Sequence, residues 1–124
     1  MRTVIAIAIA GALGALARYG IGGLILSRGG RTFPWETFIV NVSGSFILGF
    51  AFTVMTEQLT TASWLRAAVT IGFVGAYTTF STLSFETYRL IEDGAVGLAA
   101  ANVLGSAVAG LLAVYLGVVA GRAL

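Results

Sequence analysis

A dense run of hydroxyl side chains is the strongest chemical signal in this 124-residue sequence. Five Ser and Thr residues lie between Thr78 and Ser84, and they follow Gly72 and Gly75. Glycine weakens a helical ladder, and hydroxyl groups compete with it by bonding to nearby backbone groups. The run therefore predicts a break in a helix, where freed carbonyl oxygens are ready-made ligands for a cation. The alternative is an intact helix whose hydroxyls bond back to its own carbonyls.

Two asparagines offer further polar groups within apolar segments. Asn41 has a carboxamide with two donor hydrogens that need partners, which favours a binding role over the close helix packing typical of the small residues that follow it. Asn102, Ser106 and Gly110 recur every four residues and therefore share one helix face. This row is either a packing seam or a line of donors along a permeation path.

Arg18 is a charged residue inside the first apolar segment. It follows about fifteen residues of that segment, which at a rise of about 1.5 Å per residue takes it past the middle of a bilayer. One interpretation is an anchor whose charged head snorkels to the membrane surface beside Tyr19. The other is a group that attracts anions into a vestibule.

The composition indicates a membrane protein. Hydrophobic residues make up 58% of the chain and charged residues only 10%, whereas charged residues are about 25% of a soluble domain. The sequence has no Cys and no His, which argues against disulfides, thiolate chemistry, zinc ligation and the most common general base. We therefore do not expect an enzyme. Its arginines are scattered singly and form no stripe that could track phosphates, so we expect no nucleic-acid partner.

The segments between charges are long enough to cross a bilayer as helices, which takes roughly 20 apolar residues. The predicted spans are 3–26, 36–56, 65–90 and 94–121. Lipid offers no partner to backbone polar groups, and no alternation of period two supports a β-barrel. Short connections favour helices that run up and down beside each other. We predict an all-α membrane protein with one domain, residues 1–124, whose third transmembrane helix is broken near the midplane.

The distribution of arginines bears on orientation in the membrane. Three lie on the side of the N-terminus and three on the other side: Arg2, Arg66 and Arg122 against Arg28, Arg31 and Arg89. Orientation normally follows an excess of Lys and Arg on the cytoplasmic side, so an even split predicts insertion in both directions. Arg18 would tip this balance if it snorkels. Chains inserted both ways can pair as an antiparallel, two-fold homodimer.

Three motifs carry a resemblance to the small fluoride channel family, and the resemblance extends over all four spans and the full length of the chain. They are Gly11-x-x-Gly14-Ala15-x-x-Arg18-Tyr19, Asn41-x-x-Gly44-Ser45-Phe46-x-x-Gly49 and Gly72-x-x-Gly75-x-x-Thr78-Thr79-Phe80-Ser81-Thr82. The resemblance implies a channel that exports fluoride passively from the bacterial cell through its inner membrane. It also implies an antiparallel homodimer in membrane lipid, with two pores and a structural sodium ion on the two-fold axis that is not transported.

The resemblance also assigns residues. Sodium would be held by the backbone carbonyls of Gly75 and Thr78 from each subunit. The fluoride pore would be lined by Asn41, Phe80, Ser81, Thr82, Asn102 and Ser106. Arg18 and Glu86 would lie in the vestibule.

The sequence departs from the family at Leu83, where the family usually has a second phenylalanine. Leucine has no aromatic ring edge to face an anion. Phe85 lies two residues further on, about 200° around a helix, and so cannot replace the missing ring. Three outcomes are open: conduction through Phe80 alone, weaker throughput or selectivity, or a heterodimer with a paralogue that supplies the ring. We favour the first.

Two other functions fit a short chain with four spans. A small multidrug exporter of dual topology needs a carboxylate within the membrane for proton exchange, and no acidic residue is predicted near the midplane. A bundle that transports nothing and only packs against other membrane proteins predicts an unbroken third helix.

Overall fold

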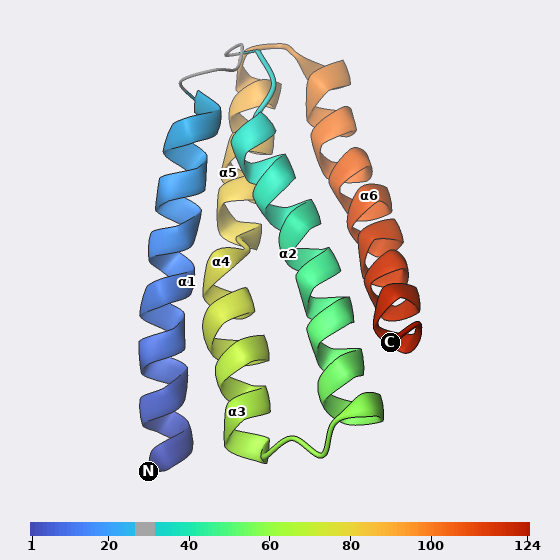
Figure 1. Ribbon diagram of the computed structural model, residues 1–124. Coiled ribbons are helices and arrows are strands. Elements are labelled where there is room, and N and C mark those ends of the chain that lie inside the picture. Colours follow the sequence, from blue (N-terminus) through green and yellow to red (C-terminus); the bar gives the residue numbers. More distant parts are fainter. Residues whose placement is uncertain (27–31) are drawn as a thin grey trace.

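The computed structural model describes residues 1–26 and 32–124, which form a bundle of long helices that run up and down (Figure 1). The first span is α1 (Arg2–Leu26), and the fourth is α6 (Val96–Arg122). The second span is α2 (Trp35–Thr53), which ends in a π-helical turn, η1 (Val54–Gln58). The third span has four parts: α3 (Ser63–Ala67), η2 (Ala68–Val74), α4 (Gly75–Tyr77) and α5 (Phe80–Glu92).

The described residues contain four helical stretches long and apolar enough to cross a membrane. They are Arg2–Leu26, Trp35–Gln58, Ser63–Glu92 and Val96–Arg122, within two residues of every predicted boundary. The prediction of four spans is therefore confirmed. Arg28 and Arg31, which the comparison of charges on the two sides requires, lie outside the described residues.

The third span is broken at its middle. Thr78 has a ψ of 159°, and Thr79 has a φ of −150° and a ψ of 112°, so both residues are extended. The last helical bond before the break runs from the Thr78 N–H to the Val74 carbonyl over 3.0 Å. The predicted break is confirmed. The alternative prediction of an intact third helix, which the non-transporting bundle requires, is wrong. The π-helical form of η2, just before the break, was not predicted.

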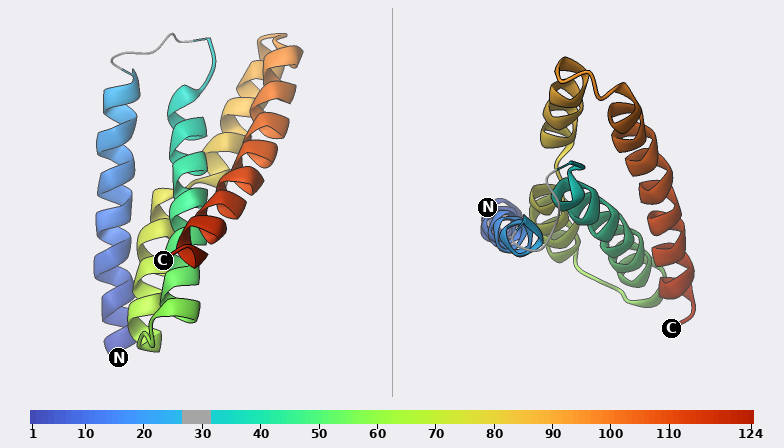
Figure 2. Two further views of the ribbon diagram at one scale, coloured as in Figure 1. Left: turned by 45° about the vertical axis from the view of Figure 1, so that its right-hand side comes forward. Right: turned by 90° about the horizontal axis from the view of Figure 1, so that it is seen from above.

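The break allows the two halves of the third span to pack against different neighbours. Helix α1 lies beside α3, η2 and α4, whereas α5 packs against α6 (Figures 1 and 2). On the α1 side, Gly14 lies so close to the carbonyl of Phe73 that a Cβ there would overlap it. Because of the two extended residues, the first half of the span packs against α1 and the second half against α6.

Helices α2 and α6 form the most extensive contact in the bundle. Glycines permit it, because a Cβ at Gly49 would overlap the carbonyl of Val114, and a Cβ at Gly117 would overlap the carbonyl of Phe46. Small residues allow this close approach of backbones, on which helix association within a membrane depends.

Replacing Gly117 with Ala is expected to destabilise the protein, since the new methyl group would overlap the Phe46 carbonyl. Overpacking of this kind typically costs about 1–3 kcal/mol. Thermal unfolding in detergent, followed by circular dichroism, would measure the loss as a lower melting temperature. Gly97→Ala is the matched control on α6, because no atom lies within 4 Å of a Cβ at that position. Equal melting temperatures for the two variants would contradict the close contact.

Candidate functional site

Asn41 of α2 bonds to both backbone polar groups of Thr79 in the break. The Thr79 N–H donates to Asn41 Oδ1 over 2.8 Å, and Asn41 Nδ2 donates to the Thr79 carbonyl over 3.1 Å. Burial of an unpaired backbone group is costly, and Thr79 is buried. The side chain of Asn41 therefore supplies the two partners that a continuous helix would otherwise have given Thr79.

The two residues before Thr79 also contact α2. Ser43 donates its proton to the Val40 carbonyl over 3.1 Å, so the hydroxyl of the buried Tyr77, 2.9 Å away, must donate to Ser43. Gly44 leaves room for the methyl group of Thr78, which a Cβ at position 44 would overlap. We call Asn41, Ser43 and Gly44 the α2 brace. Its three members contact Thr79, Tyr77 and Thr78, respectively.

The break leaves carbonyl oxygens without their helical donors. The Thr79 N–H donates to Asn41, so the carbonyl of Gly75, four residues earlier, loses the bond that a continuous helix would make. Gly75 is exposed and Thr78 is half-buried. The described residues contain no group of three or more carboxylates, His or Cys that could hold a metal ion. Oxygen atoms such as the Gly75 carbonyl are ligands that suit a hard cation.

Helix α5 begins with a cluster of hydroxyl groups. The Oγ1 of Thr79 accepts a hydrogen bond from the Thr82 N–H over 3.2 Å and so caps the helix. It also donates to Thr82 Oγ1 over 2.9 Å and lies 3.3 Å from the hydroxyl of Ser81. Ser81 and Thr82 are exposed, and Phe80, the first residue of α5, is 81% exposed. Three predicted pore residues are therefore exposed at the start of α5, beside the break.

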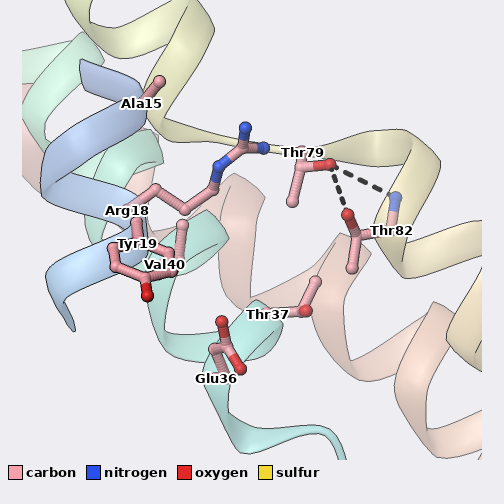
Figure 3. A pocket seen from close by; sticks show the side chains of 8 residues that line it. All are labelled: Ala15, Arg18, Tyr19, Glu36, Thr37, Val40, Thr79 and Thr82. Atoms are coloured by element: carbon pink, nitrogen blue, oxygen red, sulfur yellow. Dashed lines mark hydrogen bonds between the residues drawn. The ribbon is translucent and has the colours of Figure 1, made fainter. Parts of the chain in front are cut away.

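A cavity of about 230 Å³ lies on one side of the break, between α1, α2 and the start of α5 (Figure 3). Arg18 extends into it towards Thr79, and Glu36, at the start of α2, also lines it (Figure 3). Arg18 forms no ion pair with any carboxylate of the described chain. The structure thus places an unpaired positive charge beside the hydroxyl groups of Thr79 and Thr82, which also line the cavity.

A second cavity, of about 220 Å³, lies on the other side of the break. Its lining includes Asn41, Phe80, Leu83 and Thr79. Thr79 borders both cavities and so forms part of the wall between them. Leu83 lies in the same lining as Phe80, so the departure from the family pattern falls within the candidate site.

Glu86 does not line the first cavity but contacts a residue that does. Thr37, which lines that cavity, donates its hydroxyl hydrogen to Glu86 Oε1 over 2.7 Å. The other carboxylate oxygen of Glu86 is buried and has no hydrogen-bond partner among the described residues. Of the two predicted vestibule residues, Arg18 thus lines this cavity directly, and Glu86 bonds to Thr37, which lines it.

The polar row on α6 lies apart from both cavities. Asn102 is fully buried, and its Nδ2 donates over 3.0 Å to Thr87, whose own hydroxyl donates to the Leu83 carbonyl over 2.7 Å. Ser106 is buried too, and neither its Oγ nor Asn102 Oδ1 has a hydrogen-bond partner among the described residues. The structure therefore places Asn41 and Phe80 in one cavity lining and Thr82 in the other, whereas Asn102 and Ser106 are buried in the single chain.

Sequence reasoning missed several residues of the site. Tyr77, Thr79 and Thr37 were not singled out, although each forms a hydrogen bond that shapes a cavity wall or the break. Thr79 was within the recognised hydroxyl run, so composition drew attention to its segment. Nothing in the sequence indicated that Tyr77 and Thr37 would face Ser43 and Glu86, because these pairs lie 34 and 49 residues apart along the chain.

Comparison with known proteins adds independent evidence. Residues 5–118 match the sequence profile of the family described as "CrcB-like protein, Camphor Resistance (CrcB)". The chain is 44%, 45% and 43% identical to the fluoride-specific ion channels FluC of Geotalea uraniireducens (strain Rf4), Geobacter sp. (strain M21) and Geobacter sulfurreducens, respectively. Each alignment spans 124 residues, which is all of this chain and all of the relative. These relatives are ion channels and not enzymes, which agrees with the prediction that this chain is not an enzyme.

Proposed function

Because the chain belongs to the CrcB/FluC family of fluoride-specific ion channels, we propose that it conducts fluoride passively across the bacterial inner membrane and so lowers the cytoplasmic fluoride concentration. Identity of about 44% over the full length of a fluoride channel is the observation that carries this proposal. The broken third span, with a cavity on each side, supports it.

The chemistry of fluoride explains the residue types at the break. Fluoride is small and strongly hydrated, so a selective path must replace water with hydrogen-bond donors and the positive edges of aromatic rings. Ser81, Thr82 and Phe80 supply such groups as exposed residues at the start of α5. Arg18 adds a positive charge that draws anions towards them.

An antiparallel homodimer completes this arrangement. Gly75 and Phe80 are exposed in the single chain, and burying them requires another surface. A second, inverted copy of the chain supplies that surface and creates two equivalent pores. This pairing agrees with the even split of arginines in the sequence.

A sodium ion fits the centre of such a dimer. The carbonyls of Gly75 and Thr78 from both subunits would meet there as oxygen ligands, and Gly75 has lost its helical donor to Asn41. The bound ion supplies a fixed positive charge near both pores and holds the subunits together.

Fluoride efflux from proteoliposomes, read with a fluoride electrode, tests the proposed function. The purified chain alone is expected to release fluoride and to retain chloride, which is larger. Activity of the chain alone would also show that Leu83 does not require a paralogue to supply a second ring. Equal release of both anions would contradict fluoride selectivity. Fluoride release only after mixing with a related chain would contradict the homodimer and indicate a heterodimer.

A further inference from the structure

The contacts of Asn41 point to a role beyond that of a pore-lining residue. Its Oδ1 is occupied by the N–H of Thr79, and its Nδ2 is directed to the carbonyl of the same residue. A carboxamide can accept from the first group and donate to the second at the same time. An aspartate would keep the acceptor but set a negative oxygen against the carbonyl. An alanine would leave both backbone groups of the buried Thr79 without partners.

The same two bonds determine where the carbonyls of the break point. A residue whose N–H and C=O are both held has little freedom to rotate its peptide planes. The peptide that joins Thr78 to Thr79 contains the Thr78 carbonyl, a predicted cation ligand, and the N–H that Asn41 holds. The orientation of that carbonyl is thus coupled to Asn41, and the contact of Gly44 with Thr78 fixes the adjacent side chain.

We propose that Asn41 is a positioning residue, which holds the break in its extended form and thereby sets the affinity of the dimer for its central cation. This inference rests on the proposed function. It assigns the α2 brace to the cation site, in addition to the place of Asn41 in the cavity lining.

Two substitutions separate the two halves of the contact. Asn41→Ala removes both hydrogen bonds to Thr79, whereas Asn41→Asp retains only the acceptor. Thr70→Val is the matched control, because the Thr70 hydroxyl donates to the Arg66 carbonyl of its own helix over 2.9 Å and does not contact the break. Each protein is reconstituted, and fluoride efflux is measured over a range of sodium concentrations, with N-methyl-D-glucamine as the replacement cation.

Both Asn41 variants are expected to need about tenfold more sodium for half-maximal efflux, the factor that corresponds to about 1.4 kcal/mol. The control is expected to match the wild type throughout. An unchanged sodium concentration for half-maximal efflux in both variants would overturn the positioning role.

Hydrogen exchange of the Thr79 amide tests the contact without any ion flux. The amide is expected to be protected in the wild type, in Thr70→Val and in Asn41→Asp, and to lose protection in Asn41→Ala. Unchanged protection in Asn41→Ala would overturn the inference. A wild type that fails to conduct fluoride but shows this exchange pattern would refute the proposed channel and the cation role together, while leaving the bond itself established.

Discussion

Replacing Phe80 with Ala is expected to slow fluoride efflux by roughly 10- to 100-fold, the range that corresponds to a loss of about 1.4–2.7 kcal/mol of stabilisation along the path. Phe80 is the first residue of α5, is 81% exposed, and lines the 220 Å³ cavity next to the break. Its ring edge is a positive group that can replace water around a small anion. Efflux from proteoliposomes at saturating sodium is the measurement.

Phe85→Ala is the matched control for this experiment. It removes the same side chain from the same helix at a position that is also exposed, at 65%. Five residues along a helix correspond to about 140° of rotation, so Phe85 faces away from Phe80. The control is expected to conduct at the wild-type rate. If both variants lose conduction equally, the ring of Phe80 acts through general packing of α5 and not through contact with fluoride.

The spans and the break could be predicted because their causes are local. Charge-free stretches of sufficient length predict membrane helices wherever they occur. The Thr78–Thr79 break follows from glycines and hydroxyls within a few residues of it, which weaken the helical ladder from inside the same segment. A prediction of this kind needs no knowledge of the neighbouring helices.

The brace and the α6 row could not be predicted because they depend on how distant segments meet. Asn41 was recognised as a residue that needs partners, but the partner, Thr79, lies 38 residues away. The row of Asn102 and Ser106 has the same helical spacing whether it faces a pore or the interior. That spacing does not show how α6 packs against α2 and α5, a packing that buries both side chains in the single chain.

The π-helical segment η2 illustrates a further limit. Its residues, Ala68–Val74, are ordinary for a membrane helix, and the wider turn has no local signature in them. The close approach of Gly72 to Ile7 of α1, where a Cβ would lie only 2.8 Å from a carbonyl oxygen, is a tertiary constraint on this segment. Such constraints appear only once the helices are assembled.

Fixing the orientation of the chain is expected to abolish fluoride efflux, because a subunit that inserts only one way cannot form an antiparallel dimer. One variant, Thr60→Lys with Thr61→Lys, adds positive charge to the connection at the end of the bundle where the N-terminus lies (Figure 1). The other, Ile91→Lys with Val96→Lys, adds it around the opposite turn (Figure 1). Two charges outweigh an even split and direct the modified side to the cytoplasm.

Each orientation variant is expected to be silent when produced alone and to recover efflux when the two are produced together, since opposite orientations then coexist. Recovery in the mixture shows that neither variant fails to fold, which makes the pair its own control. Cysteine labelling from the two sides of the membrane, at a residue introduced near the C-terminus, would verify the orientation of each. Full efflux from one variant that labelling shows in a single orientation would refute the antiparallel arrangement, because parallel subunits would then conduct.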